Sequence, residues 1–71
     1  MRDNWEDLAN AIVVQAANDY RRALRVLKAH PNYSPAAKVK TEVEQFFRSE
    51  WYRSLSGVEG EVLIKGLNAE V

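Results

Sequence analysis

The sequence of 71 residues contains no cysteine. This absence excludes disulfide bridges and zinc–thiolate centres, which stabilise many other small domains. A chain of this length makes one domain at most, residues 1–71, and buries only roughly 60% of its unfolded surface on folding. Side-chain packing must therefore supply the stability, and association with another chain is one way to extend that packing.

Net charge and long apolar runs are also lacking. Ten basic residues balance ten acidic ones, so no overall field draws the chain to DNA, RNA or anionic lipid. No stretch approaches the about 20 apolar residues that span a bilayer, and the acidic residues near the amino terminus do not fit a signal peptide. We therefore expect a cytoplasmic protein that makes no membrane contact.

Catalytic and metal-binding patterns are missing as well. His30 is the only histidine, and its place beside Pro31 at an expected helix end is typical of a solvated cation. The sequence has no nucleophile–base pair, no glycine-rich phosphate loop and no metal-ligand spacing. We expect no catalytic residue, no metal site and no cofactor, and hence a protein that is not an enzyme.

Apolar residues at three- and four-residue steps predict a long first helix over residues 4–29. Its expected core face consists of Trp5, Leu8, Ala9, Ile12, Ala16, Tyr20, Ala23, Leu24 and Leu27. Asp3 or Asn4, followed by an acidic residue three positions later, fits a capping arrangement at its start. Pro31 ends the helix and begins the turn.

A second helix is predicted over residues 35–54. Ser34 as N-cap and Pro35 at the first helical position mark its start. Its apolar stripe consists of Ala36, Val39, Val43, Phe46, Phe47 and Trp51. The two helices, joined by the turn HPNYSP, are expected to form an antiparallel hairpin.

A shorter third helix is predicted over residues 57–67. Ser56 with Glu59 matches the capping box that opens many helices, and the expected buried residues are Val58, Val62, Leu63 and Leu67. Gly60 weakens this helix but permits a close approach to neighbouring backbone. A strand is conceivable only over residues 61–65. The expected fold is therefore all-α, an antiparallel helical hairpin with a short third helix.

Two carboxylates lie on or beside the predicted apolar faces. Glu50 projects into the stripe of the second helix, where a buried charge requires a partner. We favour a salt bridge to Arg53 or to an arginine of the first helix over a wet cavity or a binding surface. Asp19 lies between Gln15 and Arg22, and we favour a polar network within the first helix over a polar pocket between helices.

The carboxyl-terminal half of the first helix is locally basic. It carries Arg21, Arg22, Arg25 and Lys28. The ordinary interpretation is that these cations complement the dipole at the helix end. The alternative is an anion site, because arginines interleaved with Tyr20 and other aromatic residues suit a nucleobase and its phosphates.

The stretch FFRSEWYRSL, residues 46–55, holds four aromatic residues and two arginines. The two phenylalanines fit the core, whereas Arg48 and Tyr52 are expected on the far side of the helix and Trp51 at the boundary. This leaves more aromatic surface than a single hairpin hides, which favours a subunit interface or a ligand platform. Because Trp51 and the basic cluster lie near opposite ends of the hairpin, a symmetric dimer or higher oligomer would bring them together.

The segments WEDLANAIVVQAANDYRRAL and FFRSEWYRSLSGVEGEVLI resemble a family of small uncharacterised proteins encoded by phages and prophages of low-GC Gram-positive bacteria. The resemblance covers nearly the whole chain apart from the connector HPNYSPAAKVK. The positions that carry it are Trp5, Ile12, Gln15, Asp19, Tyr20, Arg21, Phe46, Phe47, Arg48, Ser49, Trp51, Tyr52, Leu55, Gly60, Glu61, Leu63 and Ile64. It implies a host cytoplasm and a small accessory protein that acts by binding, either blocking a host protein or sequestering a signalling molecule of host immunity.

We therefore expect a non-enzymatic, homo-oligomeric accessory protein, with an anti-defence role implied by the resemblance. Its partner is expected to be a host protein or an anionic nucleotide-like small molecule. The candidate binding residues are Asp19, Tyr20, Arg21, Arg22, Arg25, Arg48, Glu50, Trp51 and Tyr52. The alternatives are a nucleic-acid-binding regulatory module and a structural assembly subunit.

Overall fold

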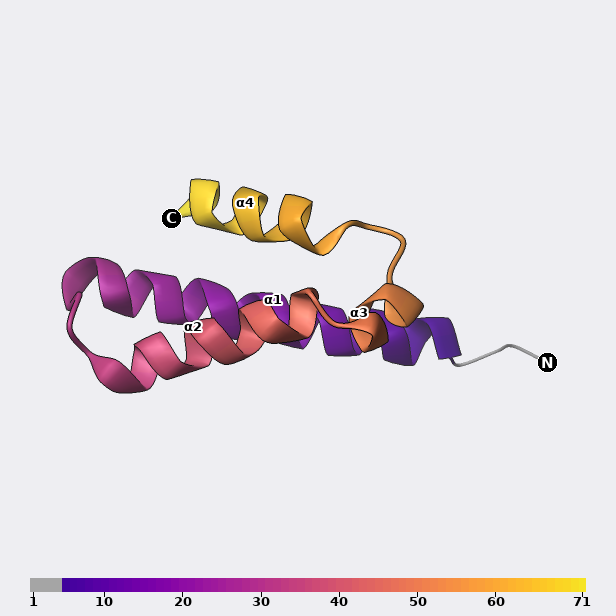
Figure 1. The fold of residues 1–71 in the computed structure, drawn as a ribbon, viewed down its shortest axis with the longest axis horizontal. Coiled ribbons are helices and arrows are strands. Elements are labelled where there is room, and N and C mark those ends of the chain that lie inside the picture. The colour runs from indigo at the N-terminus through magenta and orange to yellow at the C-terminus, as the bar shows by residue number, and fades with distance from the viewer. Residues whose placement is uncertain (1–4) are drawn as a thin grey trace.

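The computed structural model describes residues 5–71, so the capping expected at Asp3 or Asn4 lies outside the described residues. Figure 1 shows the helices α1 (Trp5–Ala29), α2 (Ser34–Phe47), α3 (Glu50–Leu55) and α4 (Gly60–Glu70). No strand occurs within residues 5–71, and the all-α prediction is confirmed. None of the helices in this part of the chain combines the length and the apolar character that a membrane crossing requires.

The helices α1 and α2 run antiparallel and form the predicted hairpin (Figure 1). At the turn, the Tyr33 N–H donates to the His30 carbonyl at 3.1 Å. Pro35 stands in the first turn of α2, where its missing N–H would have had no helical acceptor. The N-cap residue is Tyr33, which makes no side-chain cap hydrogen bond. The predicted serine cap is therefore wrong by one residue.

The predicted second helix is interrupted, because α2 ends at Phe47 and α3 begins at Glu50. Ser49 is the N-cap of α3, since its hydroxyl oxygen accepts from the Tyr52 N–H at 3.1 Å and donates to the Phe46 carbonyl at 2.6 Å. A helix that restarts after a break no longer keeps the angular phase of the one before it. The expected orientations of the residues beyond Ser49 were consequently wrong, and Tyr52 is buried while Glu50 is exposed.

The core lies where α1, α2, α3 and α4 meet. Its buried residues are Ala17, Tyr20, Leu24, Phe47, Tyr52, Ile64 and Leu67. The Phe47 ring contacts Tyr20 and Tyr52 edge to face, with ring centroids 6.0 Å and 5.5 Å apart. The predicted core face of α1 is confirmed in its middle, whereas Trp5 and Leu8 remain exposed.

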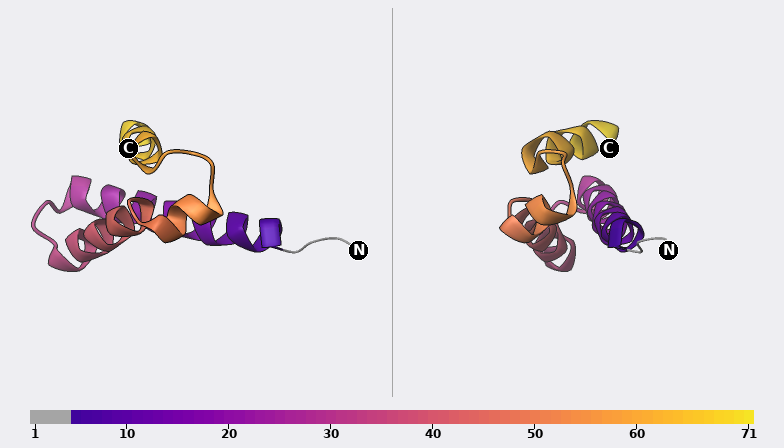
Figure 2. Two further views of the ribbon diagram at one scale, coloured as in Figure 1. Left: turned by 45° about the vertical axis from the view of Figure 1, so that its right-hand side comes forward. Right: turned by 90° about the vertical axis from the view of Figure 1, so that its right-hand side faces the viewer.

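The helix α4 lies along one side of the hairpin (Figures 1 and 2). It begins at Gly60 rather than at residue 57, with Glu59 as N-cap and no side-chain cap hydrogen bond. The Ser56 hydroxyl instead accepts from the Val58 N–H, two residues on, so the predicted capping box is wrong. Ile64 and Leu67 face the core, whereas Val58 and Val62, which were expected to be buried, are exposed.

Candidate functional site

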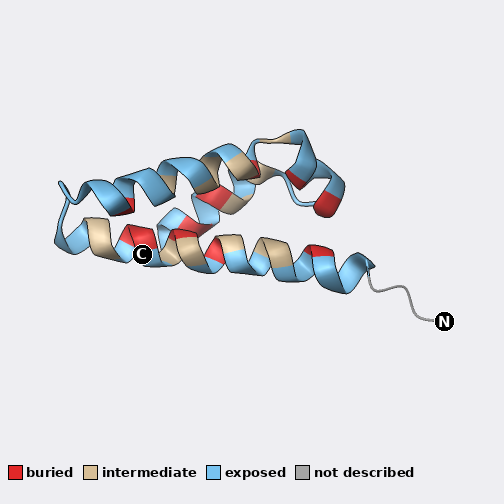
Figure 3. Ribbon diagram, turned by 90° about the horizontal axis from the view of Figure 1, so that it is seen from below, coloured by how far each residue is buried: buried red, intermediate tan, exposed pale blue. Residues whose placement is uncertain are grey.

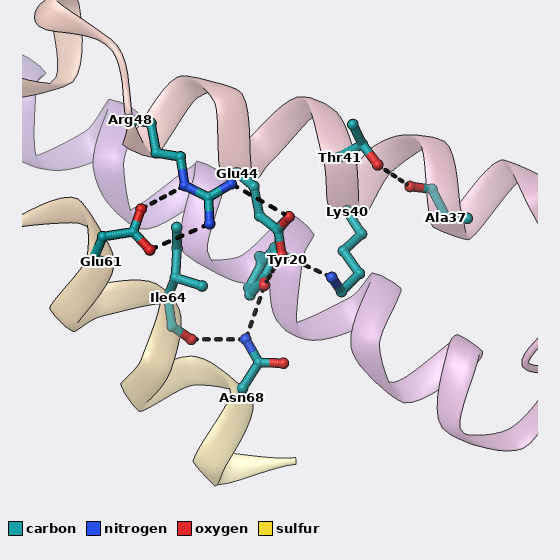
Figure 4. A network of polar contacts seen from close by, with 9 residues as sticks. All are labelled: Tyr20, Ala37, Lys40, Thr41, Glu44, Arg48, Glu61, Ile64 and Asn68. Atoms are coloured by element: carbon teal, nitrogen blue, oxygen red, sulfur yellow. Dashed lines mark hydrogen bonds and ion pairs between the residues drawn. The ribbon is translucent and has the colours of Figure 1, made fainter.

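A polar network joins α1, α2 and α4 on the side of the hairpin that α4 covers (Figure 4). The Tyr20 hydroxyl donates to Glu44 Oε2 at 2.5 Å and accepts from Asn68 Nδ2 at 2.9 Å. Lys40 Nζ also donates to Glu44 Oε2, at 2.8 Å. No local signal in the sequence indicates this network, because Tyr20 lies 24 and 48 positions from its two direct partners.

The ionisation of this network follows from its contacts. Burial, together with the hydrogen bond to Glu44, raises the pKa of Tyr20 to about 12. Partial burial alone would raise the pKa of Glu44, but the hydrogen bonds from Lys40 and Tyr20 and the nearby positive charges outweigh it and lower that pKa. The tyrosine therefore stays protonated and the glutamate stays charged at neutral pH.

Two arginines of the hairpin bind carboxylates of α4. Arg48 donates through two guanidinium nitrogens to Glu61 near the first turn of α4. Arg21 does the same to Glu70 in the last turn, at 2.7 Å and 3.3 Å. In each pair the hydrogen bond from the arginine lowers the pKa of the carboxyl group. Both arginines thus fasten α4, and their charges are matched within the chain.

The polar network predicted around Asp19 is confirmed. Gln15 Nε2 donates to Asp19 Oδ1 at 3.1 Å, and an Arg22 guanidinium nitrogen lies 3.6 Å from the same oxygen. The two charged residues border a groove of about 460 Å³ near the hairpin turn. The apolar part of the groove wall consists of Ala23, Val26, Tyr33, Pro35, Ala36 and Val39.

The groove belongs to a side of α1 that α4 does not cover. Arg21 and Lys28 share one side of α1, seven residues apart, and both donate to the end of α4, at Glu70 and at the Val71 carbonyl. Ile12, Asp19 and Val26 also recur at seven-residue steps, and the angle of 100° per residue places them on the opposite side of the helix. That side faces away from α4.

In α2 and α3, too, one side faces α4 and the other faces away from it. Lys40, Glu44 and Arg48 point toward the network under α4, whereas Val39 and Phe46 lie on the other side of α2. The Trp51 ring packs edge to face on Phe46, with ring centroids 5.6 Å apart, and is 58% exposed.

We call the surface turned away from α4 the open face. It comprises Leu8, Ile12, Val26, Tyr33, Val39, Phe46 and Trp51, with Asp19 among them. Figure 3 views the hairpin from this side and shows mostly exposed and half-buried residues. The open face therefore carries exposed and half-buried apolar residues, with the polar network of Gln15, Asp19 and Arg22 among them. No other element of residues 5–71 covers it.

The structure does not gather the nine candidate binding residues into one cluster. Tyr20 and Tyr52 are core residues, and Arg21 and Arg48 hold α4. The remaining five lie at separate places on the surface: Asp19 and Arg22 beside the groove, Arg25 one turn further along α1, and Glu50 and Trp51 in the first turn of α3. The groove residues Val26, Tyr33 and Val39 were not among the candidates, although Val39 was placed on the apolar stripe of its helix.

Comparison with protein-family models, curated proteins and solved structures gave no match. Residues 5–71 contain no group of three or more histidine, cysteine, aspartate or glutamate side chains placed to hold a metal ion. The functional argument therefore rests on the open face and on the contacts that surround it.

Proposed function

We propose that this chain is a non-enzymatic binding module that docks an α-helical protein surface on its open face. The observation that carries the proposal is the exposure of large apolar residues along this face, with Leu8 and Trp51 at one end and Tyr33 and Val39 at the other. Single exposed apolar residues are ordinary on protein surfaces, whereas a contiguous apolar patch is typical of an interaction site.

The contacts within the chain favour a protein partner over a nucleotide-like anion. Phosphate recognition uses arginine forks that are free to form paired hydrogen bonds. Arg21 and Arg48 already bind Glu70 and Glu61 in this way. The rings of Tyr20 and Tyr52 are buried and present no face for a base to stack on.

The charge distribution also favours a protein partner over nucleic acid. The formal net charge is zero, and Arg21 and Arg22 at the basic end of α1 are paired with Glu70 and Asp19. A nucleic-acid site needs an excess of unpaired positive charge along one surface. In the phage setting that the resemblance implies, an apolar docking face would serve to block a protein surface.

Site-specific photo-crosslinking tests the proposal in expressing cells. A benzophenone amino acid at position 39 lies on the open face, and the same group at position 62, where Val62 is 62% exposed on α4, is the matched control. We expect protein adducts from position 39 and none from position 62. Equal adducts at both positions, or none from position 39, would overturn the proposal.

A thermal-shift series distinguishes nucleotide binding from the proposed docking of a protein. Linear and cyclic nucleotides should leave the melting temperature of the purified chain unchanged, because Arg21 and Arg48 are already paired. A nucleotide-dependent rise that Arg22→Ala or Arg25→Ala abolishes, while Lys38→Ala leaves it intact, would instead establish an anion site at the basic end of α1.

A further inference from the structure

We infer that the occupant of the open face is a second copy of this chain, arranged so that Trp51 of each copy enters the groove of the other. The inference rests on the proposed function and names the partner of that same surface. It is carried by the opposite placement of two features, a projecting indole at one end of the face and an apolar groove at the other.

The two features lie at different ends of the hairpin because of its antiparallel course. Trp51 follows α2 and packs on Phe46 beside the amino-terminal half of α1. The groove lies between the last turns of α1 and the first turns of α2, with Val26 and Val39 on its walls. A two-fold axis that lies in the plane between the two open faces, across the long axis of the hairpin, exchanges the two ends, so both indoles meet a groove at once. An unrelated partner would have to supply its own indole and its own groove to fill both places.

The groove suits an aromatic side chain. Its depth comes from Ala23 and Ala36, whose small side chains are buried at the junction of the two helices. Tyr33 is 52% exposed at the groove wall and offers a ring for an edge-to-face contact. Tryptophan and tyrosine are the residues that most often carry interface energy when they are enclosed in such pockets.

The size of the open face matches what a specific dimer requires. The 25 residues of α1 extend about 37 Å at 1.5 Å per residue, and two packed helices are roughly 18 Å wide. The product, roughly 650 Å² before side-chain relief is counted, is close to the about 800 Å² that each partner buries in a specific interface.

The charged pair at the groove is self-complementary under the same symmetry. Asp19 is the groove residue nearest the amino-terminal end of α1, and Arg22 lies one turn further on. Both line the end of the groove that is nearer to Trp51, and hence lie near the two-fold axis. The carboxylate of one copy can there meet the guanidinium group of the other, which favours this alignment of the two faces over others.

Analytical ultracentrifugation of the purified full chain tests the inference. We expect a concentration-dependent mass that rises to twice the 8.1 kDa of one chain. Trp51→Ala and Val39→Arg should each raise the dimer Kd at least about 30-fold. Val62→Ala is the matched control and should leave the Kd unchanged. Far-UV circular dichroism should show equal helix content in all variants, because each changed side chain is exposed.

Fluorescence quenching gives a second readout that follows the indole itself. In a Trp5→Phe background Trp51 is the only tryptophan. Its quenching by acrylamide should fall as the concentration rises through the dimer Kd, and adding Val39→Arg should abolish that fall. A dimer whose Kd does not respond to either substitution would overturn the inference.

The outcomes also separate the inference from the proposed function. A chain that stays monomeric at millimolar concentration, yet crosslinks from position 39 to a different protein in cells, overturns the dimer and leaves the docking function standing. A monomer that gives no adduct from position 39 overturns both.

Discussion

The carbonyl oxygen of Phe47 lies only 2.0 Å from the point that a Cβ atom at position 60 would occupy. Glycine at that position lets the first turn of α4 pass directly over the end of α2. The glycine therefore allows α4 to begin in contact with the backbone of α2. The close backbone approach predicted for Gly60 from the sequence is confirmed.

Gly60→Ala should destabilise the fold by about 1–3 kcal/mol, because the methyl group would displace α4 from the backbone of α2. Gly66→Ala is the matched control in the same helix. A Cβ at position 66 meets nothing within 4 Å. This change should therefore raise the free energy of unfolding by about 0.5–1 kcal/mol, because alanine has a higher helix propensity than glycine. Urea unfolding followed by circular dichroism measures both. Two changes of the same sign and size would show that the contact with Phe47 does not matter.

Tyr20→Phe should cost about 2 kcal/mol, because it removes a hydrogen bond to the charged Glu44 and another from Asn68. Tyr33→Phe removes the hydroxyl of an exposed tyrosine and should change stability by less than about 0.5 kcal/mol. The difference between the two free energies of unfolding isolates the network. Equal effects would mean that the network contributes nothing.

Ser49→Ala should cost about 1 kcal/mol, because it removes the hydroxyl that caps α3. It would also loosen Tyr52, whose N–H is the capped donor. Ser54→Ala is the control, since the Ser54 hydroxyl donates only to the exposed Trp51 carbonyl. Chemical denaturation of both variants gives the comparison, and a larger cost at position 54 would contradict the assigned cap.

Stability should fall at both extremes of pH. The pKa values of Glu44, Glu61 and Glu70 are lowered in the folded chain, so their contribution is complete above the unfolded pKa of about 4.3 and is lost as the pH falls through the folded values. Unfolding free energies measured between pH 2.5 and 7 should show this loss. The double variant Glu61→Gln, Glu70→Gln should flatten the acid limb, and an unchanged slope would exclude these ion pairs as its cause.

The alkaline limb has a different origin. The pKa of Tyr20 is raised from 10.0 to about 12, so its contribution is complete below pH 10 and is lost as the pH rises toward 12. Tyr20→Phe should remove this part of the pH dependence, whereas Tyr33→Phe should leave it in place. Spectrophotometric titration of the tyrosines locates the shifted group directly.

The local sequence pattern was sufficient for the hairpin. Residues with an apolar period of 3.6 and clear stop signals gave α1 as 4–29, against an observed Trp5–Ala29. The position of the turn after it was predicted correctly, because Pro31 and Pro35 restrict the backbone locally. Tertiary packing added little to this part of the fold.

The break at Ser49 shows where periodicity misleads. Phe46, Phe47 and Trp51 continue a helical stripe on paper, yet Ser49 followed by Glu50 is also a start signal, with a short polar N-cap and an acidic first turn. That signal was present in the sequence. The break is favoured because it directs the Tyr52 side chain into the core, where it is buried.

The polar network and the open face depended on long-range geometry. Nothing near Tyr20 in the chain indicates that Glu44 and Asn68 will meet its hydroxyl. The excess of aromatic surface was foreseen, but which side of the hairpin α4 would cover was not. α4 covers the side on which Ile64 and Leu67 pack into the core. The exposed ion pairs of Arg21 and Arg48 add to this contact.

The fastening of α4 at both ends has a consequence for its register. Leu63, Leu67 and Val71 recur every four residues, so a slide of one helical turn would still place apolar residues against the hairpin. It would also bring a residue with a Cβ atom against the Phe47 carbonyl in place of Gly60. A slide of about 5.4 Å would separate Glu61 from Arg48 and Glu70 from Arg21 together. The close approach at Gly60 and the two ion pairs thus oppose the same shift of α4.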